Sequence, residues 1–149
     1  MILFLGLLTI VSIALLVGTE FAVSAFVNPV LWRLDAPARI AATRLFAALL
    51  GKVMPFWYAG NLLLLVIEAL VRRSQPGLSL LAGAAGVWAA VIVLSLLVLV
   101  PINNRMAQLS PNTPSDRDLR EHKRWDALHR VRVAALSAAF IASLIAMHA

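Results

Sequence analysis

Four long apolar stretches, separated by shorter polar ones, dominate the pattern of this sequence. Glu20 and Glu68 are the only carboxylates inside the apolar stretches, and none of the stretches contains Lys or Arg. The stretches are residues 1–32, 53–71, 74–104 and 133–149. About 20 residues cross a hydrocarbon core of about 30 Å, and backbone polar groups in lipid must pair within their own segment. The pattern therefore predicts four membrane-spanning helices, at about residues 2–27, 50–71, 78–100 and 126–148.

The composition fits the same class. Of the 149 residues, 62% are hydrophobic and 13% are charged, against about 45–50% and about 25% in soluble domains. We predict an all-α integral membrane protein that forms a single four-helix-bundle domain over residues 1–149. The first stretch lacks a basic start and exceeds the roughly 7–15 apolar residues of a signal peptide, so we expect a retained span. The sequence has no cysteine, which excludes disulfides, thiolate metal sites and cysteine nucleophiles.

The basic residues predict the orientation in the membrane. Four spans place both termini on one side and the first and third connections on the other. Eleven of the thirteen Lys and Arg residues lie in or beside residues 28–49 and 101–125, and the other two are Arg72 and Arg73. By the positive-inside rule, these two loops are cytoplasmic and both termini are outside, in the periplasm. We expect a multi-pass protein of a bacterial inner membrane, and no nucleic-acid partner, because the net charge of +6 follows from this topology.

Turn-forming residues mark the predicted ends of the spans. Asn28-Pro29 and Pro101 are expected to end or bend the first and third spans, because the residue before a proline disfavours helix. Gln75-Pro76-Gly77 predicts a tight turn between the second and third spans.

The fourth helix is expected to begin earlier than the membrane requires. Thr113-Pro114-Ser115-Asp116 is typical of a helix start, with Thr as the cap and Pro in the first position. A helix from Pro114 to about His148 would extend into the cytoplasm. Small residues at four-residue spacing predict helix-packing faces; they are Ala82, Gly86 and Ala90, Ala134 with Ala138, and Ala135 with Ala139.

Polar residues from three helices fall in one layer near the cytoplasmic edge of the membrane. Glu20 lies about 27 Å, and His129 about 29 Å, from the outer ends of their helices at 1.5 Å per residue. Asn28, Asn103 and Asn104 end their spans on the same side. Because ionisable groups inside a membrane are costly, each one is a candidate functional residue. This convergence predicts a polar site in which Arg132 and Trp125 share a helix face with His129.

Two roles remain open for several of these residues. Glu20 is either a structural partner of Arg132 or a functional carboxylate, acting as a metal ligand or as a base. Asn61, near the middle of the membrane, either lines a cavity or bridges two helices. Glu68 precedes Arg72 by one helical turn, which predicts an ion pair.

Familiar motifs of soluble enzymes and haem sites are missing. The sequence has no glycine-rich phosphate loop, nucleophile elbow or His-Glu-x-x-His pair. All three histidines lie on the fourth predicted helix, whereas haem held by two histidines inside a bundle needs facing helices. We therefore expect no haem.

Three stretches together resemble a known family. They are Thr19-Glu20-Phe21 with Phe26-Val27-Asn28-Pro29-Val30-Leu31, then Val100-Pro101-Ile102-Asn103-Asn104, and Trp125-Asp126-Ala127-Leu128-His129-Arg130-Val131-Arg132. In this pattern the chain resembles the anthrone-oxygenase-like family of small four-helix membrane proteins. The resemblance implies oxidation of a lipophilic phenolic or polycyclic substrate by O2. The positions that match the family are Glu20, Asn28, Asn103, Asn104, Trp125, His129 and Arg132.

The predicted site residues could support oxygenase chemistry in two ways, with a metal ion or without one. In one, Glu20 and His129 are metal ligands for iron, copper or zinc, which imidazole and carboxylate both suit. In the other, His129 or Glu20 deprotonates the substrate, and Arg132 and the asparagines stabilise the oxyanion. Trp125, Trp57 and Tyr58 could provide aromatic walls, or serve as interfacial anchors.

Two other functional classes stay open. The first is a non-catalytic binding or accessory protein for a lipid, a quinone or a partner membrane protein, with Glu20 and Arg132 as a structural pair. The second is an ion or proton pathway, for which Asn61 is the main polar residue in the middle of the membrane. A homo-oligomer is compatible with every class.

Overall fold

Helices account for nearly all of the chain that the structure describes. The structure is a computed structural model that describes residues 2–110 and 115–148. The elements are α1 (Ile2–Ala22), the π-helical turn η1 (Val23–Val27), α2 (Asn28–Leu31), α3 (Ala36–Val71), α4 (Leu78–Leu94), the π-helical turn η2 (Ser95–Leu99), α5 (Val100–Met106) and α6 (Asp116–His148). No strand occurs within the described ranges.

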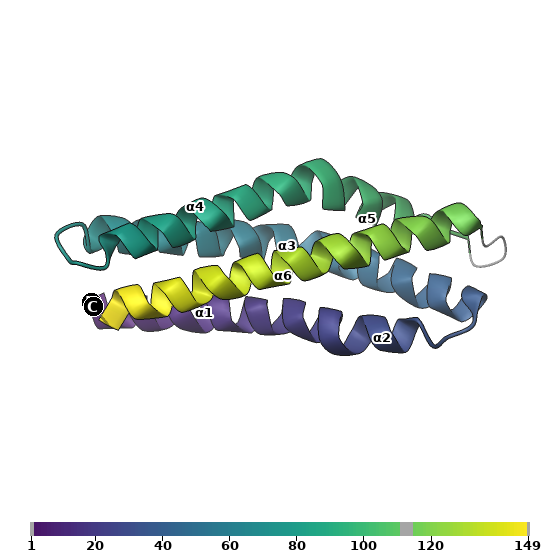
Figure 1. Cartoon of the computed structure of the whole chain (residues 1–149), viewed down its shortest axis with the longest axis horizontal. Helices are drawn as coiled ribbons and strands as arrows, with labels where there is room; N and C mark the ends of the chain where they lie inside the picture. Colours follow the sequence, from purple (N-terminus) through teal and green to yellow (C-terminus); the bar gives the residue numbers. More distant parts are fainter. Residues whose placement is uncertain (1, 111–114, 149) are drawn as a thin grey trace.

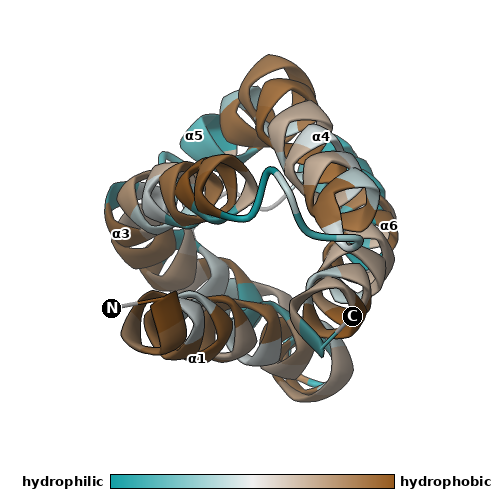
Figure 2. Ribbon diagram, turned by 90° about the vertical axis from the view of Figure 1, so that its left-hand side faces the viewer, coloured by the Kyte–Doolittle hydropathy of each residue, from teal (hydrophilic) through white to brown (hydrophobic). Residues whose placement is uncertain are grey.

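These elements form four long helices that run up and down (Figure 1). The first is α1–η1–α2, the second α3, the third α4–η2–α5 and the fourth α6. The first packs on the second and fourth, and the third packs on the same two (Figure 2). All four are long and apolar enough to cross a membrane. The predicted all-α class, with four potential membrane helices, is confirmed.

The two ends of the bundle differ in charge. We call the end with the α2–α3 and α5–α6 connections the basic end, because Arg33, Arg39 and Arg117 lie there. The other end holds the α3–α4 turn, the start of α1 and the end of α6, and we call it the terminal end (Figures 1 and 2).

Apolar side chains cover the outside of the bundle as well as its core. The core includes Leu16, Leu65, Trp88 and Leu136, all fully buried. In the most apolar part of each long helix, only 22–28% of the residues are buried. So much exposed apolar surface is unfavourable in water and is solvated by lipid in a multi-pass membrane protein.

The two predicted breaks at proline are bends within helices that continue. Each π-helical turn ends two residues before a proline, ahead of Asn28-Pro29 and of Val100-Pro101. A proline ring clashes with the carbonyl four residues earlier and offers no N–H, and a π turn widens the helix at that point. Figure 1 shows the resulting bend between α4 and α5.

Two regions predicted as loops are more helical than expected. Residues 28–49 were assigned to a loop, but α3 already begins at Ala36, where the Asp35 carboxylate accepts a hydrogen bond from the Ala38 N–H at 3.5 Å. Pro37 in the first turn suits this start. Residues 101–125 were also assigned to a loop, but α5 extends to Met106 and α6 already begins at Asp116.

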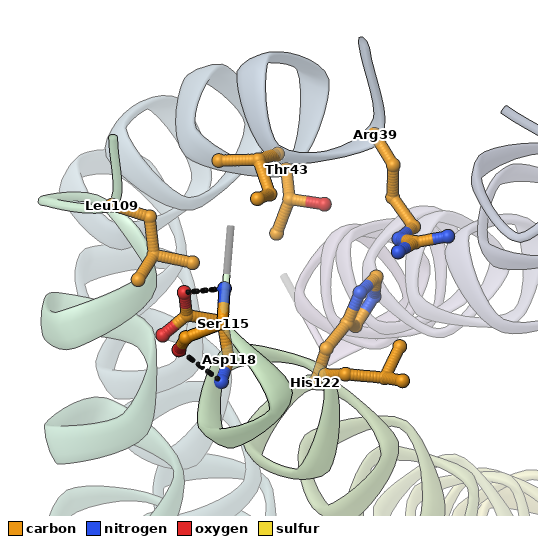
Figure 3. Close-up of a pocket in the computed structure, with 8 residues that line it drawn as sticks. Arg39, Thr43, Leu109, Ser115, Asp118 and His122 are labelled. Carbon is orange, nitrogen blue, oxygen red and sulfur yellow. Dashed lines mark hydrogen bonds between the residues drawn. The ribbon is translucent and has the colours of Figure 1, made fainter. Parts of the chain in front are cut away.

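The start of α6 is capped reciprocally. Ser115 Oγ accepts from the Asp118 N–H at 3.3 Å, and the Asp118 carboxylate accepts from the Ser115 N–H at 3.1 Å (Figure 3). This is a capping-box arrangement. Thr113 and Pro114, which were predicted to begin this helix, lie outside the described residues.

Within the bundle, two of the three predicted small-residue rows do not face the core. Ala82, Gly86 and Ala90 are exposed, as are Ala134 and Ala138. Only the row of Ala135 and Ala139 faces the core. In α4 the buried face consists of Leu81, Ala84, Trp88 and Val91.

Candidate functional site

A cavity of about 330 Å³ lies between the middle of the bundle and its basic end. Its volume falls within the range of about 300–1,000 Å³ that small-molecule sites occupy. All four long helices contribute to its wall. Seven of the nine site residues predicted from the sequence line it: Glu20, Tyr58, Asn103, Asn104, Trp125, His129 and Arg132.

Glu20, His129 and Arg132 form one buried network on this wall. Arg132 Nη2 donates to Glu20 Oε2 at 2.6 Å, and the same nitrogen lies 2.9 Å from His129 Nδ1. Glu20 Oε2 and His129 Nδ1 are 3.2 Å apart. Glu20 is 3% exposed and His129 1%. A buried carboxylate requires such a partner, because an unpaired charge in this environment is strongly destabilising.

The contact of the second ring nitrogen of His129 determines which of the two ring nitrogens carries the proton. His129 Nε2 lies 3.1 Å from the backbone carbonyl of Glu20, which can only accept a hydrogen bond. The network therefore assigns the N–H to Nε2 in the neutral ring. Nδ1 then presents a lone pair to Arg132, so Glu20 and His129 both accept from one guanidinium nitrogen.

The π-helical turns lie next to this network. Glu20 comes three residues before η1, and Ser95 is the first residue of η2. Ser95 Oγ accepts from Arg132 Nη1 at 3.4 Å. Such turns often occur at functional sites. Sequence reasoning missed Ser95, and its only signal was a hydroxyl at the depth of Arg132 in an otherwise apolar run.

Aromatic rings hold the network from two sides. The Trp125 ring stacks on His129 with centroids 4.7 Å apart and an interplanar angle of 10°. The Arg132 guanidinium lies over the Tyr58 ring, 5.5 Å from its centroid. This contact is within the range of a cation–π interaction.

Asn103 fixes the approach of the second and third long helices. Its Nδ2 donates to the Ala47 carbonyl at 2.9 Å. A Cβ atom added to Gly51 would lie 2.9 Å from the same Nδ2, so glycine leaves room for this amide. Asn104, one residue later, is exposed and lies on the cavity rim.

Two predicted site residues do not line this cavity. Asn28 Nδ2 donates to Asp126 Oδ1 at 2.7 Å, which joins α2 to α6. Asn61 Oδ1 accepts from Ser12 Oγ at 2.6 Å. Of the two predicted roles of Asn61, lining a cavity or bridging two helices, the structure therefore shows the bridge. The predicted pair of Glu68 and Arg72 is present at the terminal end, at 2.8 Å.

The donor set does not fit a metal ion. Glu20 and His129 are the only His or acidic side chains on this wall, and the described residues contain no group of three His, Cys, Asp or Glu side chains suited to a metal. The Arg132 guanidinium lies within 2.9 Å of both, where its positive charge would oppose a second cation. The predicted role of Glu20 and His129 as metal ligands is not supported, and we derive no step through a metal.

Two polar groups of the cavity residues lack a partner. Tyr58 Oη and Arg132 Nε are buried, and neither has a hydrogen-bond partner among the described residues. Most buried polar groups in proteins are satisfied. Both are donors on residues that line the cavity, but the two atoms have almost no accessible surface, so a ligand oxygen reaches them only if these side chains shift.

The cavity also has an exposed, apolar side. Gly51, Pro55 and Ala59 follow one another at four-residue spacing on α3, and each lines the cavity and is exposed. Leu96 of η2 also lines the cavity and is 56% exposed. The cavity therefore opens between α3 and the third long helix.

Fold and site together define a multi-pass helical membrane protein with a buried ion-paired network beside a cavity. A family model described as anthrone oxygenase matches residues 43–142, about two thirds of the chain. The protein belongs to the anthrone oxygenase family, as its sequence motifs predicted. The match contains every predicted residue of the cavity except Glu20. No curated protein and no solved structure matches the chain.

Proposed function

We propose that this protein is a membrane-embedded oxidoreductase of the anthrone-oxygenase type, which oxidises a lipophilic phenolic or polycyclic substrate with O2. The observation that carries the proposal is the combination of a 330 Å³ cavity with two unpartnered donors, Tyr58 Oη and Arg132 Nε, beside the Glu20–His129 pair. An aromatic ketone and its enol both carry an oxygen that these donors can bind once the two side chains shift to expose them. The remaining wall is largely apolar and suits flat rings.

The Glu20–His129 pair is the base in this proposal. Glu20 Oε2 and His129 Nδ1 both accept from Arg132 and lie 3.2 Å apart. A proton taken from the substrate would come to lie between these two atoms as a new N–H···O bond. General bases of this kind typically contribute about 10²–10⁴-fold.

Arg132 and Tyr58 stabilise the substrate anion. When a CH2 group next to an aromatic ketone loses a proton, the negative charge moves to the ketone oxygen. Donors aimed at that oxygen stabilise the charge as it develops. Trp125 and Tyr58 offer ring faces on which a flat substrate can lie.

The electron-rich anion then reduces O2 without a further reductant. Carbon transfers its electrons to dioxygen, a C–O bond forms, and the stored proton gives a substrate hydroperoxide. Loss of the second C–H proton breaks the O–O bond and leaves a ketone and water. The balance is R₂CH₂ + O₂ → R₂C=O + H₂O, so one oxygen atom enters the product.

The substrate enters from the bilayer in this proposal. The opening between α3 and the third long helix has exposed apolar or small residues, among them Pro55, Ala59 and Leu96. A lipophilic compound dissolved in the membrane reaches the cavity there without crossing water.

The proposed topology places the basic end in the cytoplasm and both chain ends in the periplasm of a bacterial inner membrane. The support is the distribution of Lys and Arg, which are concentrated at the basic end. The cavity then lies nearer the cytoplasmic face, and the basic start of α6 extends beyond the membrane.

The function is tested by anthrone oxidation with purified protein in lipid nanodiscs. We expect protein-dependent formation of the quinone, and a drop in kcat/KM of about 10²–10³-fold in Arg132→Met, which is typical when an oxyanion donor is lost. Arg130→Met is the matched control, because Arg130 pairs with Asp126 and does not line the cavity. Tight binding of anthrone without turnover would favour a non-catalytic binding protein instead.

A further inference from the structure

Two smaller cavities continue from the main cavity toward the basic end. The middle cavity, of about 30 Å³, shares Val23, Leu50, Asn103 and Trp125 with the main one. The third cavity is also about 30 Å³ and lies at the basic end. It shares Thr43 and His122 with the middle cavity. The three therefore form a row along the bundle.

Polar side chains line the small cavities at the points where they meet. Thr43 is 7% exposed, and its hydroxyl has no hydrogen-bond partner among the described residues. His122 is 5% exposed, and its ring stacks on Trp32 with centroids 4.4 Å apart. In Figure 3 the side chains of Thr43, His122 and Arg39 border the same space.

Charged groups surround this row on two elements, α3 and α6. Asp118 and Asp126 lie on α6 with His122, and Arg39 lies on α3. Arg39 is placed over Trp32, 5.4 Å from its ring centroid. Asp126 is held by Asn28 of α2 and by Arg130. The basic end of the row is therefore polar and close to the surface.

The size and chemistry of the small cavities suit water. A cavity needs about 10–15 Å³ to hold one water molecule, and the water needs polar partners. Each small cavity meets the first requirement. His122 and Asn103 supply partners along the row, and the buried Thr43 hydroxyl would add one if it rotates toward the cavities. A cavity lined by apolar groups alone would stay dry.

We propose that this row is a water path that joins the basic end of the bundle to the Glu20–His129–Arg132 network and carries protons between them. The path enters the main cavity past Trp125 and Asn103, beside the stacked His129 ring. Its use in catalysis rests on the proposed function, in which the reaction releases water and moves protons. The path itself requires no substrate.

Nuclear magnetic resonance of ¹⁵N-histidine-labelled protein in nanodiscs tests the path directly. The chain has only three histidines, so the spectrum contains three imidazole rings, which His→Gln variants of His122 and His148 assign. We expect the His129 Nε2–H to exchange with bulk water in the wild type. In Ala47→Leu, which places a larger side chain in the middle cavity, we expect that exchange to slow at least tenfold.

The controls separate a blocked path from a disturbed fold. Ala48→Leu changes the neighbouring exposed position and should leave the exchange rate unaltered. Thr43→Val keeps the shape of the side chain but removes the hydroxyl, so it should slow exchange with an unchanged Tm. Equal His129 exchange in the wild type, Ala47→Leu and Thr43→Val would overturn the path. Because the readout needs no turnover, an inactive protein with wild-type exchange would count against the proposed oxidation alone.

Discussion

Arg132 is the residue on which the electrostatics of the site depend. It donates to Glu20 Oε2 and Ser95 Oγ, its Nη2 contacts His129 Nδ1, and it lies over the Tyr58 ring. Its positive charge is what allows a carboxylate to remain in a largely apolar interior. The same charge makes a metal ion at this place unfavourable.

Replacing Arg132 should destabilise the fold, because the buried Glu20 carboxylate loses its cationic partner. Arg132→Met leaves Glu20 without its cation, and breaking a buried pair in this way costs about 3–5 kcal/mol of folding free energy. The double variant Glu20→Gln with Arg132→Met should recover most of that loss. Denaturant unfolding of the two single variants and the double variant measures the coupling. Additive losses in the double variant would show that the two side chains do not interact.

Replacing Tyr58, unlike replacing Arg132, should not lower the stability of the fold. Its hydroxyl lacks a partner among the described residues, and an unsatisfied buried hydroxyl is unfavourable by about 1–3 kcal/mol. Tyr58→Phe should therefore be at least as stable as the wild type while its kcat falls. Thermal unfolding and steady-state kinetics on the same preparation check both parts. A destabilised variant with unchanged kcat would mean that the hydroxyl is structural.

The sequence predicted the residues of the network better than their contacts. Glu20, His129 and Arg132 could be placed in one layer because helix rise alone fixes their depth. The direction of a side chain around a helix depends on packing, and for this reason Asn28 and Asn61 were predicted to belong to the site but do not line the cavity. Asn28 turns to Asp126 and Asn61 to Ser12, away from the cavity.

At the scale of elements, the third long helix does most to shape the cavity. The η2 turn allows it to pass Pro101 without ending, and it places Ser95, Leu99 and Asn103 on the cavity wall. The sequence located the disturbance at proline because the residue before a proline disfavours the helical conformation. Whether a helix stops, bends or widens there depends on its neighbours, so the π turns were not predictable.

The opening beside α3 leads to a test of substrate entry. Ala59→Trp places a large ring at an exposed position that lines the cavity. We expect kcat/KM for a membrane-dissolved substrate to fall at least tenfold, because access is blocked. Gly60→Trp is the matched control, since a Cβ atom there meets nothing within 4 Å and Gly60 does not line the cavity. Equal activity of the two variants would contradict entry by this side.

On the scale of the whole molecule, apolar residues face both the core and the lipid. Leu65 is fully buried and Phe56 is 81% exposed on the same helix, although both are large hydrophobic residues. A pattern of hydrophobic positions therefore predicts that these helices span a membrane but not which face packs inward. This explains why Ala82, Gly86 and Ala90 were assigned to a packing face and lie outside.

The basic end provides a test of orientation. If Arg and Lys keep that end in the cytoplasm, alkaline phosphatase fused after His148 should be active in a bacterial host, because this enzyme requires the periplasm. Fusion after Leu34 should be inactive. A green fluorescent protein fusion at each site should give the reverse pattern. Activity at Leu34 and none at His148 would invert the topology and place the water path at the periplasmic face.

The proposed reaction is tested most directly by isotope labelling. Anthrone is incubated under ¹⁸O₂ with wild-type protein and with Glu20→Gln, and the product is analysed by mass spectrometry. We predict a quinone that contains one ¹⁸O atom per molecule, formed at a rate that falls at least a hundredfold in Glu20→Gln. A product oxygen derived from water, or equal rates with and without Glu20, would contradict oxidation by O2 at this site.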